Sequence, residues 1–189
     1  MSSTKTSQLA VRAAYVAAVL FIIRLPTFFV PAIRDALPTS SPVLSELNAL
    51  LGIAPHLVLF PVVAALPAPR WGRAAGYGWL VIDMATDIMD LGGVAKLTYL
   101  SLRYGGHISA ALWIASASWD ARGALRIVGW LLAFDLAIYS FIAPFGALTF
   151  LVLLPSLVLL PLWLALVGRY MARGNENAQV RDKQAMEGR

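Results

Sequence analysis

Three aspartates recur at regular spacing along one apolar stretch of the chain. Asp83, Asp87 and Asp90 are four and then three residues apart, so in a helix all three lie on one face. Carboxylates that share an apolar face repel one another, and they are tolerated where a proton, a cation or a basic partner compensates their charge. The spacing therefore predicts a binding or catalytic site in which a carboxyl group holds or exchanges a proton.

Other polar residues interrupt the neighbouring apolar runs, namely Arg24, His56, His107, Asp135 and Tyr139. A carboxyl group in apolar surroundings favours its protonated form, which suits it to general acid–base catalysis. We predict that Asp83 and Asp135 are the acid and the base, and that Arg24 is their charge partner. Asp87 and Tyr139, the latter one helical turn beyond Asp135, complete the predicted catalytic set.

Each of these residues also has a purely structural interpretation. Arg24 paired with an aspartate could simply hold two helices together, and a lone histidine in a helix bundle is more often a hydrogen-bonded packing residue than a ligand. His56 and His107 are therefore secondary candidates. Asp90 is a third, because we expect it at the membrane surface in contact with water.

The elements that position these side chains must cross a membrane. Hydrophobic residues make up 59% and charged residues 13% of the chain, against about 45–50% and about 25% in soluble domains. A span needs about 20 mostly apolar residues, and five segments qualify: Leu9–Val30, Ala49–Leu66, Ala74–Leu91, Ala124–Phe145 and Leu148–Val167. A sixth, around Gly105–Trp119, reaches spanning length if its helix begins within Lys96–Tyr104. We predict an all-α polytopic membrane bundle of six transmembrane helices over residues 1–168, followed by a polar cytoplasmic tail at 169–189.

The basic residues predict which way the bundle faces. With six spans, eleven of the fifteen lysines and arginines fall on the side of the two termini. Basic segments are retained in the cytoplasm, so both termini are predicted to be cytoplasmic in the cell membrane, whereas five spans would spoil the asymmetry. The four basic residues on the far side are Arg24, Arg34, Lys96 and Arg103. Counted from the nearest cytoplasmic arginine, Asp83 and Asp135 lie about 15 and about 14 Å deep, and we expect the polar site to open toward the outside.

The composition also excludes several classes of function. The chain has no cysteine, which rules out disulfides, thiolate metal sites and thiol catalysis. Its basic residues are scattered singly, without the basic face that nucleic-acid binding needs. Two histidines on one side could ligate haem, but in six helices this is weak evidence. We predict no cofactor, no metal and no nucleic-acid partner. The expected partners are the lipid bilayer, a lipophilic small molecule and, if the site is shared between copies, a homodimer.

Two resemblances to known families bear on these predictions. The run IDMATDIMDLGGVAK is similar to the DxxDGxxAR motif of CDP-alcohol phosphotransferases, but Leu91 replaces its glycine, Lys96 comes one position late and no GxxxDxxxD follows. We therefore reject that activity. The segments VRAAYVAAVLFIIRLP, RGALRIVGWLLAFDLAIY and LPLWLALVGRYM give a layout that resembles a family of uncharacterised bacterial six-helix membrane proteins, a domain of unknown function. That resemblance implies the topology, and no functional residue carries over from it.

Three functions remain open from the sequence. The first is a membrane-embedded enzyme, of the isomerase or lyase type, that cyclises or isomerises a lipophilic small molecule by acid–base chemistry. The second is a proton- or cation-coupled transporter or channel, and the third is a non-catalytic accessory subunit. The inner halves of the predicted spans offer no polar continuation for a transport pathway, which favours the enzyme.

Overall fold

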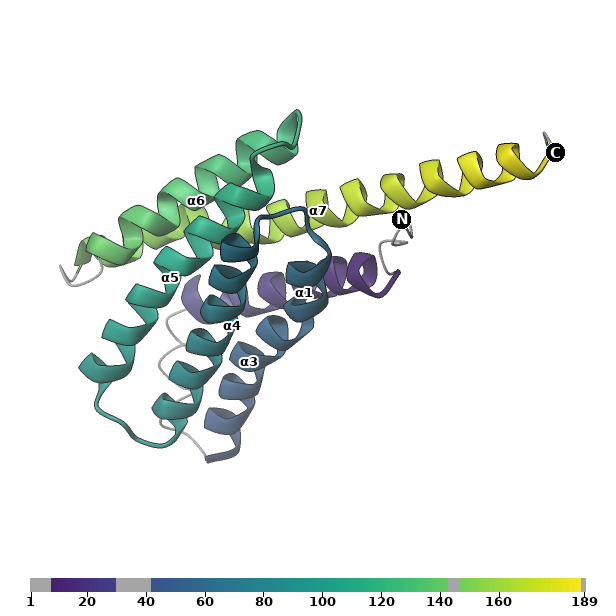
Figure 1. Ribbon diagram of the computed structural model, residues 1–189. Helices are drawn as coiled ribbons and strands as arrows, with labels where there is room; N and C mark the ends of the chain where they lie inside the picture. Colours follow the sequence, from purple (N-terminus) through teal and green to yellow (C-terminus); the bar gives the residue numbers. More distant parts are fainter. Residues whose placement is uncertain (1–7, 30–41, 143–146, 188–189) are drawn as a thin grey trace.

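The computed structural model describes residues 8–29, 42–142 and 147–187, and everything regular within them is α-helical (Figure 1). The predicted all-α class is confirmed. The six helices of the described residues are α1 (Gln8–Phe29), α3 (Pro42–Ala65), α4 (Arg70–Leu91), α5 (Lys96–Ser118), α6 (Ala124–Ile142) and α7 (Ala147–Glu187).

Four of the helices in the described part of the chain are long and apolar enough to cross a membrane: α1, α3, α6 and α7. Apolar helices of this length indicate a protein embedded in a membrane. The helices α4 and α5, with 22 and 23 residues, are long enough to cross a membrane, but neither contains a stretch as apolar as those four. Because α5 begins at Lys96 and is continuous, the short fourth segment does extend to a helix of spanning length. That all six helices cross the membrane stays a prediction.

Some predictions fall outside the described residues: the span ends at Val30 and Phe145, and the basic residues Lys5, Arg34 and Arg189. At the other boundary, α7 continues without interruption from the apolar segment into the polar segment that follows residue 168. The predicted tail is therefore helical as far as Glu187, and its location in the cytoplasm stays a prediction.

The helices are arranged as a closed ring. Each described helix packs against the next along the chain, and α7 packs against α1 to complete the circle. The start of α1, the turns at 66–69 and 119–123, and the end of α7 lie at one end of the bundle, which we call the turn end (Figure 1). A ring of six helices encloses a central space to which every helix can contribute side chains.

Small residues let the helices approach closely where the ring closes. The buried face of α1 is built from alanines, including Ala10, Ala14 and Ala17, and small side chains are what allow membrane helices to pack backbone to backbone. On the facing surface of α7, a Cβ atom at Gly168 would lie 2.9 Å from the ring of Tyr15. A side chain at residue 168 would therefore displace the ring of Tyr15 from its place against α7.

Candidate functional site

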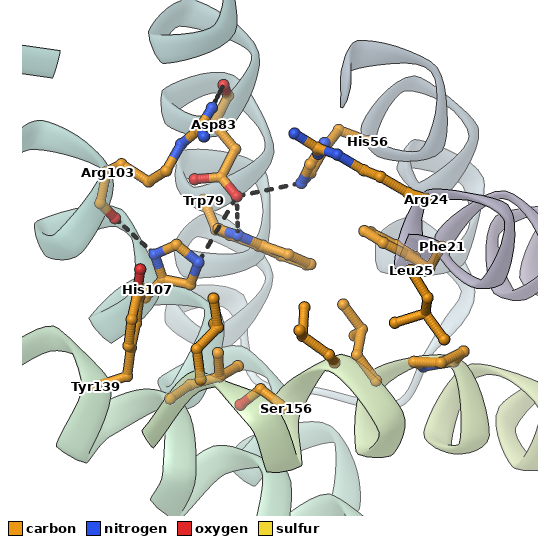
Figure 2. Close-up of a pocket in the computed structure, with 15 residues that line it drawn as sticks. Phe21, Arg24, Leu25, His56, Trp79, Asp83, Arg103, His107, Tyr139 and Ser156 are labelled. Atoms are coloured by element: carbon orange, nitrogen blue, oxygen red, sulfur yellow. Dashed lines mark hydrogen bonds and ion pairs between the residues drawn. The ribbon is translucent and has the colours of Figure 1, made fainter. Parts of the chain in front are cut away.

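A cavity of about 120 Å³ lies inside the ring, and all six described helices line it. Its polar lining residues are Arg24, His56, Trp79, Asp83, Arg103, His107, Tyr139 and Ser156 (Figure 2). Leucines of α7 and of α1 form the facing, apolar wall. A space of this size holds a few water molecules or the head of a larger ligand.

Asp83 is the centre of the polar wall. Its side chain is buried, and its Oδ2 atom accepts a hydrogen bond from Trp79 Nε1, one turn earlier on α4, at 2.9 Å. The same oxygen lies 3.1 Å from His56 Nε2 on α3 and 4.0 Å from His107 Nε2 on α5 (Figure 2). Three helices therefore direct polar groups at one carboxylate oxygen.

The backbone fixes the tautomer of both histidines. His56 Nδ1 lies 2.7 Å from the carbonyl oxygen of Gly52, and His107 Nδ1 lies 2.7 Å from the carbonyl oxygen of Arg103. A carbonyl oxygen can only accept a hydrogen bond, so each Nδ1 must carry the hydrogen. This arrangement leaves both Nε2 atoms directed toward Asp83.

The contact between His56 and Asp83 therefore requires one more proton. With Nδ1 already protonated, a neutral His56 presents only a lone pair at Nε2, and so does an ionised Asp83 at Oδ2. At 3.1 Å the two atoms must share a proton, as imidazolium with carboxylate or as imidazole with carboxylic acid. The pair is thus a proton-holding unit set in an apolar bundle.

Phe21 and Trp79 hold the His56 ring from its sides. The ring centroids lie 5.6 Å and 5.4 Å from that of His56, and both contacts are edge-to-face. On the other side of the cavity the His107 ring meets Tyr139 edge-to-face, at 5.1 Å. Edge-to-face aromatic contacts restrict ring rotation, so both Nε2 atoms stay directed into the site.

Asp87 anchors a second charged group one turn above Asp83. Its Oδ1 atom forms an ion pair with Arg103 and lies 3.8 Å from Arg24 Nη2. A Cβ atom at Gly52 would collide with Asp87 Oδ2 and approach Arg24 Nη2 to 3.2 Å. The missing side chain at residue 52 is therefore what lets α3 close over this charged layer.

Arg103 connects the two aspartates, although the sequence predicts only the side of the membrane on which it lies. Its Nε donates to Thr86 Oγ1 at 2.8 Å, and its Nη2 donates to the Asp83 carbonyl at 3.3 Å. The carbonyl of Arg103 in turn receives the Nδ1 hydrogen of His107. One signal could have identified it, since Arg103 precedes His107 by one helical turn and so faces the same side of its helix.

The structure brings together most of the predicted site residues and leaves two apart. Five of them line the cavity: Arg24, His56, Asp83, His107 and Tyr139. Asp87 contacts the two arginines that line the cavity, Arg24 and Arg103. Asp135 does not line it and instead accepts a hydrogen bond from Ser156, which does. Asp90 is exposed near the end of α4. The geometry thus gives Asp83 histidines as its partners rather than Asp135.

A layer of tryptophans closes the site toward the turn end. Trp79, Trp113 and Trp163 come from three helices and are 0–2% exposed. Their ring centroids follow one another at 5.8 and 5.3 Å, and Trp163 Nε1 donates to Ser118 Oγ at 3.0 Å. We call these three residues the tryptophan layer. It places apolar rings between the polar site and the turn end.

Among the described residues, no group of three or more histidines and acidic side chains is arranged to hold a metal ion.

Neither protein-family models nor curated proteins nor solved structures match the chain. The resemblance to the family of uncharacterised six-helix proteins stays a prediction. The function has to be argued from the geometry of the cavity.

Proposed function

We propose that all six helices cross the cell membrane and that both termini face the cytoplasm. The distribution of lysines and arginines supports this orientation. The charges of α4 and α5 are compatible with crossing, because Asp83 and Asp87 are buried and contact basic side chains of neighbouring helices. In this orientation the cavity opens toward the outer half of the membrane.

The protein acts as a membrane-embedded enzyme that isomerises or cyclises a lipophilic small molecule by proton transfer. The observation that carries this proposal is the convergence of two tautomer-fixed histidines on a single oxygen of Asp83. General acid–base catalysis needs a group that holds a proton within reach of the substrate. The apolar wall opposite, formed largely by leucines of α7, suits the hydrocarbon part of a lipophilic substrate that arrives from the lipid.

His107 is the group that exchanges the proton with the substrate. Its Nε2 lies too far from Asp83 Oδ2, at 4.0 Å, for a hydrogen bond, so this nitrogen is open to a ligand in the cavity. When Nε2 accepts a proton from a carbon next to a carbonyl group of the substrate, the imidazolium faces the carboxylate of Asp83. The shared proton then resides on His56. Transfer of a proton from His107 to a second carbon, after exchange of that proton with water, completes an isomerisation without any change in composition.

The tryptophan layer favours an enzyme over a transporter. A transport pathway must continue from the cavity to the turn end through polar or hydrated groups. Trp79, Trp113 and Trp163 fill that direction with fully buried rings. A site that is reached from one side only suits binding and chemistry better than passage.

The test uses the protein in lipid nanodiscs with a total lipid extract from the membranes of its source organism. We expect one species of the extract to be converted to a product of equal mass and different chromatographic retention, which takes up deuterium when the reaction is run in D2O. Asp83→Asn and His107→Gln should slow the conversion by about 10²- to 10⁴-fold, the usual contribution of a general acid or base.

Asp90→Asn is the matched control, since it removes a carboxylate of the same helix that is exposed. It should leave the conversion unchanged. The absence of any protein-dependent product of equal mass, or full conversion by folded Asp83→Asn protein, would contradict the enzyme proposal. Proton or cation uptake by sealed vesicles that needs Asp83 would favour the transporter instead.

A further inference from the structure

A second and larger hollow, of about 800 Å³, lies at the turn end of the bundle. The turn at 66–69, the start of α4, the end of α5 and the first half of α6 enclose it. Three of the chain's six tryptophans line it, Trp71, Trp119 and Trp130. We call this hollow the tryptophan groove, and it is separate from the cavity at Asp83.

The walls of the tryptophan groove are largely apolar, and its tryptophans are exposed. Trp71 is 59% and Trp119 60% exposed, and Leu112 and Trp130 are also exposed large hydrophobic side chains. The rings of Trp119 and Trp130 are 5.4 Å apart between centroids. A continuous apolar surface of this kind is covered by an apolar partner in the functional state, and tryptophan is the residue that favours the level where acyl chains meet headgroups.

The chain segments that frame the tryptophan groove are basic, although no arginine is among the residues that line it. The two segments that frame it, 66–73 and 119–130, contain four arginines and one aspartate, which leaves a net charge of +3. Arg70 stands between Pro69 and Trp71, which both line the groove. Arg126 precedes Trp130 by one helical turn and so faces the same side of α6. Asp120, the single acidic residue, lines the groove as well. An occupant with an apolar body and a negatively charged head fits both the walls and the rim.

We propose that the tryptophan groove binds one anionic phospholipid, whose acyl chain lies against the three tryptophans and whose phosphate contacts Arg70 and Arg126. Arginine matches phosphate oxygens in a bidentate manner, and basic pockets between membrane helices are suited to acidic headgroups. A second copy of the chain fits less well. A two-fold interface would place the same basic rim on both partners, and like charges would face each other across it.

The experiment measures quenching of tryptophan fluorescence by brominated acyl chains in phosphatidylcholine nanodiscs. The brominated chains are carried either by phosphatidylglycerol or by phosphatidylcholine at equal mole fraction. We expect stronger quenching by the brominated phosphatidylglycerol. The concentration that gives half of this extra quenching should rise by about fivefold for each arginine removed, in Arg70→Gln and Arg126→Gln and in the double variant.

The matched control is the double variant Arg12→Gln/Arg173→Gln, which removes two exposed arginines of α1 and α7 outside the groove. It should quench as the unmodified protein does. Equal quenching by the two lipids, an equal loss in the control, or extra quenching that survives phenylalanine at all three groove tryptophans would overturn the proposal. Protection of these tryptophans from both lipids would also overturn it, in favour of a second copy.

Discussion

The two halves of the bundle interior are both buried, but different forces hold them together. Around Asp83 and Asp87, helices meet through charged and hydrogen-bonded contacts, and Asp83 Oδ1 and Asp87 Oδ2 are buried without a hydrogen-bond partner among the described residues. In the tryptophan layer, helices meet mainly through packed rings and glycines. Trp163 donates to Ser118 and Trp79 to Asp83, and Trp113 Nε1 is buried without a hydrogen-bond partner in the described part of the chain. Apolar packing fixes the second half, while the first keeps carboxylate groups whose hydrogen-bonding capacity is not exhausted. That difference is typical of a binding or catalytic site whose residues are held in place by a closely packed apolar layer beside it.

The largest loss of unfolding free energy should come from removing the carboxylate of Asp87, which holds the arginines of the polar half in place. Asp87→Ala leaves the partly buried guanidinium of Arg103 without its carboxylate and removes a carboxylate that lies 3.8 Å from Arg24. Breaking one member of a buried pair costs about 3–5 kcal/mol of unfolding free energy. Reversible unfolding in a denaturing detergent measures the change, with Asp90→Ala as the exposed control. A loss below about 1 kcal/mol, the level of a surface pair, would show that the two halves do not differ in this way.

A smaller effect should come from overfilling the tryptophan layer. A Cβ atom at Gly129 would collide with Ser118 Oγ and lie 2.9 Å from Trp163 Nε1. Gly129→Ala should therefore lower the unfolding free energy by about 1–3 kcal/mol. Gly78→Ala is the matched control because a Cβ atom there meets nothing within 4 Å, and it should raise stability by about 0.5–1 kcal/mol. If both glycine variants behave alike, the layer is not closely packed.

The same contrast explains what could be predicted from the sequence. A charge in an apolar bundle must face inward and find a partner, and this rule was enough to bring Arg24, His56, Asp83 and His107 into one site. Helix positions followed in the same way from apolar length. Both predictions depend only on a free-energy cost, that of placing a charged group in lipid or an apolar segment in water.

The partners within the site could not be predicted, because they depend on how each helix is rotated about its axis. Close contacts such as those at Gly52 and Gly106 set these rotations, and no pattern in the sequence reveals them. Asp135 is turned toward Ser156 instead of Asp83 for this reason. Asp90 shares the helical stripe of Asp83, but it lies at the end of α4 and is exposed. The spacing of residues along one helix predicts which of them share a face of that helix. Only the packing of the helices determines which residues of other helices they contact.

The most direct test of the account is the ¹⁵N NMR spectrum of the two imidazole rings in nanodiscs. The carbonyls of Gly52 and Arg103 require a hydrogen on Nδ1 of both histidines. We therefore expect two protonated Nδ1 signals and, for His56, an Nε2 signal intermediate between the protonated and unprotonated positions, which Asp83→Asn shifts to the unprotonated position. Histidines with a hydrogen on Nε2 and none on Nδ1, or a His56 signal that does not respond to Asp83→Asn, would contradict the shared proton at the centre of the site.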